Sequence, residues 1–307
     1  MGRPSATGSP AASDATAPGV ARPEGWTGRR IGTLVLQGLS IAGAGFAITA
    51  VGMLFRDGFG AGVDLQAYMR AGDAIRSGGP VYTTGVAEGL AFLYSPVWAV
   101  LFATISWLPG WLLQAAIMAL DLAALRYAIG SWIGVGLFAW YPMVWFEFSS
   151  GNIDILIAAA IVMAWRHTAA PLAVVAFAKV SPILALDPKR LREFVVVAIV
   201  LLAITIPWAG LWIEYAQFLA RQPSVHGTVI AIPWYVRLPF ALLLLLPRRP
   251  WTSALAAIVA VPTWYWYTSV MLIAPIRLFV DDWRRRRERQ TTEEPGKRPD
   301  DPAIGAV

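Results

Sequence analysis

The stretch that decides the fold is IGTLVLQGLSIAGAGFAITAVGMLF, residues Ile31–Phe55, in which no side chain is charged. A helix needs about 20 apolar residues to cross the hydrocarbon core of a bilayer, and this run is long enough. Arg29 and Arg30 precede it, and positive charge beside a span favours the cytoplasmic side. Residues 1–28 are rich in Pro, Ala, Ser and Gly, so we expect a disordered cytoplasmic tail before an uncleaved signal anchor.

The composition extends this prediction to the whole chain. Of 307 residues, 57% are hydrophobic and 14% are charged, and the mean hydropathy is +0.57. One soluble core of this size would not hide so much apolar surface, so we predict an all-α, polytopic transmembrane helical bundle in the cell membrane, with the lipid bilayer as partner. The chain has no cysteine, which excludes disulfides and thiolate–metal sites.

The net charge of +6 raises the question of nucleic-acid binding. The basic residues, however, lie in short clusters between apolar runs: Arg29-Arg30, Lys189-Arg190 with Arg192, Arg248-Arg249, and Arg284–Arg287. This pattern indicates membrane topology rather than a nucleic-acid surface. With each cluster on the cytoplasmic side, both termini are cytoplasmic. The chain then has about eight spans: Ile31–Phe55, Trp111–Ile129, Trp132–Phe148, Ile153–Trp165, Phe194–Pro207, Ile232–Leu246, Trp251–Pro262 and Tyr267–Phe279.

Two apolar segments do not fit this alternation as full spans. Pro96–Leu108 has no basic residue at its end, so we expect a half-inserted or interfacial helix on the outer side. Ala169–Leu186 is too short for two crossings, so we expect a re-entrant hairpin that turns near Lys179. The predicted organisation is a membrane domain at 29–283, with an outer catalytic loop at 56–94, and a basic disordered cytoplasmic tail at 284–307.

The outer loop contains two acidic residues on a segment with helical spacing, Asp64–Ser77. Asp64 and Asp73 are nine residues apart, which at about 100° per residue places them on opposite faces. Asp73 has Arg70 and Arg76 at three-residue spacing and is expected to form solvated ion pairs. For Asp64 the loop leaves two readings open, a helix N-cap and a functional carboxylate.

Other polar residues are expected near the outer face. Lys179 lies in an apolar stretch where an unpaired ammonium costs at least about 2.5 kcal/mol, so it either snorkels to the interface or, as its place at a turn favours, meets an anionic lipid headgroup or phosphate. Asn152 and Asp154 lie at the mouth of a helix, which Asn152 would cap. Trp212 fits an interfacial aromatic belt or a sugar-stacking surface. Glu214 and His226 share its loop, and their spacing does not mark a metal site.

The order of these motifs resembles glycosyltransferase family 87 over Ile31–Ala209. That order is the first span, Asp64 and Tyr68, Gly78–Tyr82, Phe92–Pro96, Gly151–Asp154 and Lys179–Pro182. Members of that family are integral membrane enzymes of the C-type glycosyltransferase fold. They transfer sugars, typically mannose, from polyprenyl phosphate.

The resemblance implies a role for each matched residue. Asp64 corresponds to the general base, Tyr94-Ser95-Pro96 to an aromatic-Pro-Pro motif, Gly151–Asp154 to a Gly-Gln-x-Asn motif, and Lys179 with Pro182 to a Lys-x-x-Pro motif. Ser95, Asn152 and Asp154 differ from the family residues at their positions. The implied donor phosphate or sugar contacts are Lys179, Asn152, Asp154, Tyr68 and Tyr94, and possible acceptor or sugar contacts are Trp212, Glu214 and His226.

These observations predict an inverting glycosyltransferase with its active site on the outer face. Its partners would be a polyprenyl-phosphate sugar and an acceptor that is a glycan, a glycolipid or a protein; no cofactor is expected. Two alternatives stay open. The broken hairpin also suits a membrane transporter of lipid or solute. The chain is shorter than is usual in the family it resembles, which also suits an inactive scaffold.

Overall fold

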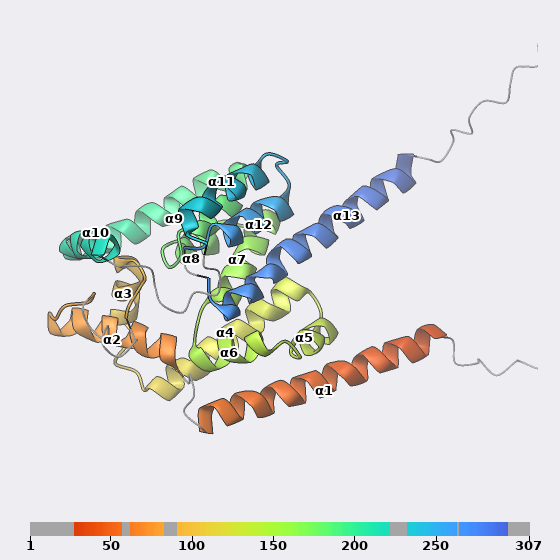
Figure 1. The fold of residues 1–307 in the computed structure, drawn as a ribbon, viewed down its shortest axis with the longest axis horizontal. Helices are drawn as coiled ribbons and strands as arrows, with labels where there is room; N and C mark the ends of the chain where they lie inside the picture. Colours follow the sequence, from red (N-terminus) through yellow and green to blue (C-terminus); the bar gives the residue numbers. More distant parts are fainter. Residues whose placement is uncertain (1–27, 57–61, 83–90, 222–231, 263, 294–307) are drawn as a thin grey trace, which may run out of the picture.

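The computed structural model describes residues 28–56, 62–82, 91–221, 232–262 and 264–293. Every regular element in these residues is helical, which confirms the predicted all-α class (Figure 1). The α-helices include α3 Pro96–Ala103, α9 Leu191–Ile204, α10 Gly210–Arg221, α11 Trp234–Leu245 and α12 Pro250–Val259. The 3-10 helices are η1 Ser181–Ala185, η2 Pro188–Arg190, η3 Ile206–Trp208 and η4 Trp266–Leu272.

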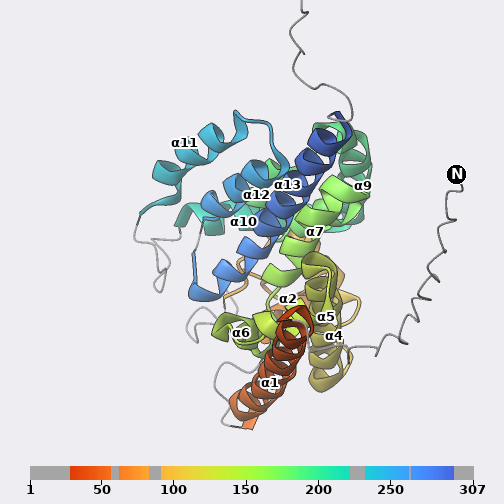
Figure 2. The ribbon, with the colours of Figure 1, turned by 90° about the vertical axis from the view of Figure 1, so that its right-hand side faces the viewer.

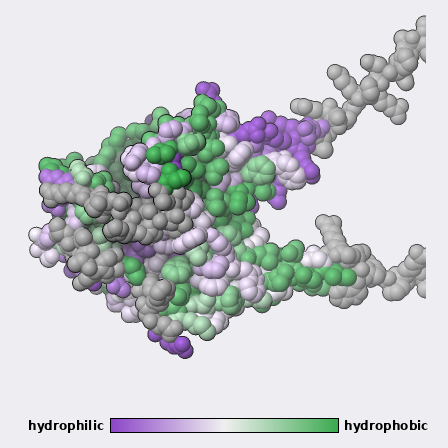
Figure 3. All heavy atoms as spheres, viewed as in Figure 1, coloured by the Kyte–Doolittle hydropathy of each residue, from purple (hydrophilic) through white to green (hydrophobic). Residues whose placement is uncertain are grey.

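Helix α1, Gly28–Arg56, lies along one side of the molecule and exposes most of its apolar side chains (Figures 1 and 2). It packs against α5, Trp132–Phe138, through glycines on both helices. A Cβ at Gly136 would lie 2.0 Å from Ser40 Oγ, and one at Gly43 would lie 2.2 Å from the Gly136 carbonyl oxygen. Small residues of this kind let helix backbones approach closely in membranes. The remaining apolar surface of α1 (Figure 3) suits contact with lipid.

The number of long apolar helices is smaller than the sequence suggested. In the described residues, α1 and α4, Gly110–Ile129, are long and apolar enough to cross a membrane. Helices α6, Pro142–Ser150, and α7, Asp154–Arg166, add a third span if this pair, bent by 103°, is one broken span. A helical membrane protein is consistent with this, but the prediction of about eight spans is not.

The span count differs because several apolar runs are divided into helices too short to span. Trp132–Phe148, expected to cross once, contains α5 and α6 with a break between them. α12 has 10 residues, and α9 has 14. A span needs about 20 residues, and hydropathy alone does not reveal where a run is interrupted.

Helix α7 forms the centre of the core. Ile155, Ile157 and Ile161 are all fully buried, and the helix is apolar around its whole circumference. A helix of this kind must be covered on all sides, and α4, α8 (Ala170–Ala176), α13 (Ile273–Glu293) and η4 all contact it. The break before α7 is therefore held inside the protein.

The segments Pro96–Leu108 and Ala169–Leu186, which the sequence analysis did not count as full spans, have the expected local structure. The region expected as an interfacial helix forms the eight-residue α3. The region expected as a hairpin breaks after α8, and η1 begins at Ser181. Lys179 lies in the turn between them, as predicted.

Helix α13 continues through the basic cluster to Glu293, whereas the predicted tail begins at 284. Pairs at four-residue spacing stabilise this extension. Arg277 lies 3.4 Å from Asp281, and Arg286 lies 3.2 Å from Asp282. Asp281 also pairs with Arg166 of α7 at 2.8 Å, which ties α13 to the core. The distal part of the helix forms a hydrophilic projection (Figure 3).

Candidate functional site

The candidate site is built around the break between α6 and α7. α6 ends at Ser150 and is followed by Gly151, whose φ of 73° favours glycine; α7 begins at Asp154. Glu147 lies one turn before the break, and its Oε2 accepts a hydrogen bond from the Asp154 backbone nitrogen at 3.2 Å. The predicted cap, Asn152, accepts instead from Ile153 N at 2.7 Å. The N-cap reading of Asn152 is wrong because Glu147 supplies the acceptor for the start of α7.

Helix α2, Val63–Ser77, brings the outer-loop acid to this break. Its N-cap, Gly62, donates a backbone hydrogen bond to the Ser149 carbonyl at 2.6 Å. Gln114 of α4 donates to the Phe148 carbonyl at 2.8 Å and fixes the same end of α6. A Cβ at Gly151 would lie 2.9 Å from Leu65 Cβ, so the first turn of α2 rests directly on the break. This contact positions Asp64.

Asp64 is partly buried in the first turn of α2. Burial is the main cause that raises the pKa of Asp64 to about 6; Lys179 and a hydrogen bond from Ser150 oppose the rise, and the charge of Asp154 contributes to it. The N-cap reading of Asp64 is wrong, because Gly62 holds that position. Asp73, on the opposite face, is exposed and lies 3.7 Å from Arg76, as predicted.

Lys179 and Asp154 form a buried ion pair. The Lys179 ammonium donates to Asp154 Oδ1; the Asp154 side chain is fully buried, and that of Lys179 is 12% exposed. The snorkelling reading of Lys179 is wrong, because the charge is held inside the protein beside an acid that the sequence analysis placed only at a helix mouth. An anionic ligand at Lys179 would have to share the ammonium with Asp154.

Two acidic residues of the site were missed by the sequence analysis, Glu147 and Asp121. Both are fully buried, and both interact electrostatically with Asp154. Asp121 lies in the middle of α4, and in the described residues neither of its carboxylate oxygens has a hydrogen-bond partner. An acidic side chain inside a membrane span costs free energy and is therefore a sign of a functional site. Asp121 could have been identified as a candidate site residue from the sequence on this ground.

The site contains more acids than bases. Asp64, Glu147 and Asp154 all interact electrostatically with one lysine, Lys179, and Asp121 interacts with Asp154 and Glu147. One oxygen of Glu147 and one of Asp154 also lack a hydrogen-bond partner in the described residues. Carboxylates close together and away from water repel one another unless a proton or a cation is present. No three His, Cys, Asp or Glu side chains in the described parts of the chain are grouped as metal ligands.

Tyr68 and Tyr94 form the inner wall beside Asp64. The Tyr68 hydroxyl donates to the Tyr94 hydroxyl at 3.0 Å, and the two rings meet edge to face with centroids 5.0 Å apart. Tyr82 donates to the Tyr94 carbonyl at 3.1 Å. All three side chains are buried, and Tyr68 and Tyr94 both interact electrostatically with Asp64.

Tyr265 and Tyr267 were not predicted as site residues. Their rings stack with centroids 5.1 Å apart, and both interact electrostatically with Asp64. They belong to the aromatic run at 264–267. Two aromatic faces next to a carboxylate are typical of sugar-binding surfaces.

The expected acceptor residues lie on α10 or outside the described residues. Trp212 Nε1 donates to Thr205 Oγ1 at 3.0 Å, and its ring contacts Phe177. Glu214 is exposed and interacts electrostatically with Tyr82. These contacts connect α10 to Thr205, Phe177 and Tyr82, and none of them involves Asp64. His226 lies outside the described residues.

Gly151→Ala tests whether the contact between α2 and the break positions Asp64. A Cβ at this residue would combine an unfavourable φ with the 2.9 Å approach to Leu65 Cβ, so we expect a loss of stability of about 1–3 kcal/mol. Thermal unfolding of the purified chain measures this. Gly79→Ala is the control, since its Cβ would meet no atom closer than 3.5 Å and its φ is not positive. Equal melting temperatures of the two variants would contradict the assigned contact.

Comparison with protein-family models, curated proteins and solved structures finds no match to this chain.

Proposed function

We propose that the chain is an inverting glycosyltransferase that moves a sugar, mannose by resemblance, from a polyprenyl-phosphate donor to an extracytoplasmic acceptor, with Asp64 as general base. The observation that supports this proposal is the convergence of Asp64, Asp154 and Lys179 at one helix break, although they are far apart in sequence. The same three residues lie in the motifs whose order resembles glycosyltransferase family 87.

The chemistry needs a base and a group that stabilises a phosphate leaving group. Asp64 takes the proton from an acceptor hydroxyl as its oxygen bonds to the anomeric carbon. The bond from that carbon to the phosphate oxygen breaks on the opposite side, which inverts the configuration and releases polyprenyl phosphate. Lys179 stabilises the charge that develops on the phosphate. Its pairing with Asp154 holds the ammonium in place between reactions.

The pH dependence of sugar transfer tests the role of Asp64. Because burial raises the pKa of Asp64 to about 6, the carboxylate is protonated below that pH and cannot accept a proton. We therefore expect kcat/KM to rise tenfold per pH unit below about 6 and to level off above about 7. The measurement uses purified protein with polyprenyl-phosphate mannose and a mixture of membrane glycolipid acceptors. A profile that is flat between pH 5 and 7 would rule out Asp64 as the titrating base.

A membrane transporter is the second candidate, and the buried acids favour it specifically. Asp121, Glu147 and Asp154 lie beside a broken helix pair, and transporters bind ions at such breaks. Sealed liposomes distinguish the two functions. A transferase makes a covalent glycoconjugate and works in detergent, whereas a transporter moves an unchanged substrate and needs a sealed membrane.

A further inference from the structure

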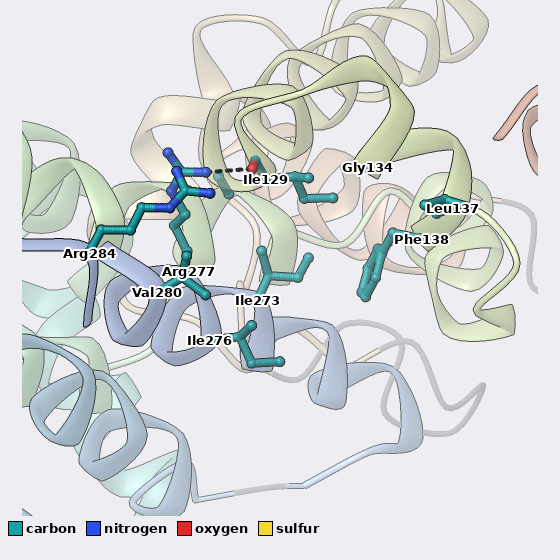
Figure 4. A pocket seen from close by; sticks show the side chains of 10 residues that line it. Ile129, Gly134, Leu137, Phe138, Ile273, Ile276, Arg277, Val280 and Arg284 are labelled. Carbon is teal, nitrogen blue, oxygen red and sulfur yellow. Dashed lines mark hydrogen bonds between the residues drawn. The ribbon is translucent and has the colours of Figure 1, made fainter. Parts of the chain in front are cut away.

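A groove that is separate from the Asp64 site lies between α13 and the α4–α5 corner (Figure 4). Its volume is about 450 Å³, within the range of roughly 300–1,000 Å³ typical of small-ligand sites. Leu137 and Phe138 of α5 line one side, and Ile273 and Ile276 of α13 line the other.

The groove changes from apolar to basic along α13. Ile273, Arg277, Val280 and Arg284 are spaced by four, three and four residues, so they lie on one face of the helix. Both isoleucines of this lining, Ile273 and Ile276, precede the two arginines, and Val280 lies between Arg277 and Arg284. Figure 4 shows both arginines at the same end of the groove. A ligand matching this surface has an apolar chain and an anionic head.

The basic end is built into the fold. Arg277 donates to the Ile129 carbonyl at 2.7 Å, which satisfies the end of α4. Its guanidinium occupies the space where a Cβ of Gly130 would lie, 2.3 Å from Arg277 Nη1. Arg284 lies two turns further along α13 and is exposed. Arg277 therefore fixes the groove, while Arg284 is available to a ligand.

The same end carries the signs of a membrane interface. Trp132, at the start of α5, is 59% exposed, and Arg126 lies over its ring at 5.5 Å from the centroid. Exposed tryptophan with nearby arginine is typical of the level of lipid headgroups. Basic pockets between membrane helices bind anionic lipid heads.

We propose that this groove binds one anionic glycerophospholipid of the surrounding bilayer. The phosphate lies against Arg284 with Arg277 beside it, and one acyl chain lies along Ile273, Ile276 and Phe138. The occupant is a membrane lipid rather than the lipid-linked sugar of the proposed reaction, because the groove does not include Asp64, Asp154 or Lys179. The inference does not depend on the proposed function.

The test measures binding of single lipids to the purified full chain by native mass spectrometry. The probes are phosphatidylglycerol and phosphatidylcholine with identical acyl chains. We expect the wild-type chain to bind phosphatidylglycerol at least five times more tightly than phosphatidylcholine. Arg284→Gln should remove this preference, and Arg285→Gln, which removes the same charge from a residue outside the groove, should retain it.

A second variant separates the groove from general surface charge. Val280→Trp adds bulk to the groove lining beside the two arginines and keeps both of them, so it should weaken binding at least fivefold. Its folding is checked by thermal unfolding, and if it does not fold the comparison of Arg284→Gln with Arg285→Gln decides. Equal losses in those two variants, or equal binding of the two lipids by the wild-type chain, would overturn the proposal.

Discussion

Asp64→Asn is expected to lower kcat/KM for sugar transfer by about 10²–10⁴-fold while making the folded chain more stable. The amide has nearly the same shape as the carboxylate and keeps an oxygen that accepts from Ser150, so the packing of α2 on the helix break should not change. It cannot take a proton from the acceptor hydroxyl. Activity is measured with polyprenyl-phosphate mannose, and stability by thermal unfolding of the same preparation.

The gain in stability follows from the sign of the pKa change at Asp64. Burial raises this pKa from 3.8 to about 6. Above pH 6 the Asp64 carboxylate is therefore charged in the folded chain, and its buried position makes this charge destabilising. The full difference corresponds to at most about 3 kcal/mol, and partial exposure reduces it to about 1–2 kcal/mol. The gain from Asp64→Asn should be complete above pH 6 and should shrink as the pH falls toward 4, where the folded wild-type chain has regained its proton.

Asp73→Asn is the matched control, because Asp73 lies on the opposite face of the same helix and its side chain is 58% exposed. It should leave both activity and stability nearly unchanged. If Asp64→Asn retains full activity, Asp64 is not the base. If it loses activity and also unfolds at a lower temperature, the loss reflects structure, and the catalytic role of Asp64 is unsupported.

The sequence predicted local structure well where it depended on nearby residues. The helical spacing of Asp64–Ser77, the separation of Asp64 from Asp73, and the turn at Lys179 all follow from periodicity or from short breaks, and the structure contains each of them. The sequence analysis named Asp64, Asp154 and Lys179 as site residues from motif order rather than from geometry, and the structure brings the three side chains close enough to interact.

What the sequence could not predict depended on contacts between distant segments. The number of spans failed because hydropathy does not reveal that Trp132–Phe148 is divided into α5 and α6. Glu147 was missed because its role as the acceptor for Asp154 N depends on the 103° bend between α6 and α7. The partner of Lys179 was missed because nothing in the sequence indicates that two residues 25 positions apart are paired.

Lys179→Met should strongly destabilise the chain. Methionine matches the length of lysine but has no charge, so Asp154 and Glu147 would remain buried without the cation that interacts with both. Removing one partner of a buried ion pair costs about 3–5 kcal/mol, which corresponds to a fall in Tm on the order of 10 °C for a domain of this size. Thermal unfolding in one detergent measures this, and sugar transfer should be lost with it.

The double variant Asp154→Asn with Lys179→Met tests whether that loss comes from charge rather than from packing. It removes both members of the pair and leaves no uncompensated charge at Asp154, so it should recover at least half of the stability lost in Lys179→Met. It should not recover sugar transfer, because the proposed phosphate-stabilising ammonium is still absent. If the double variant loses as much stability as the sum of the two single changes, Lys179 and Asp154 are not energetically coupled. Sugar transfer at the wild-type rate would refute the assignment of Lys179 to the leaving group.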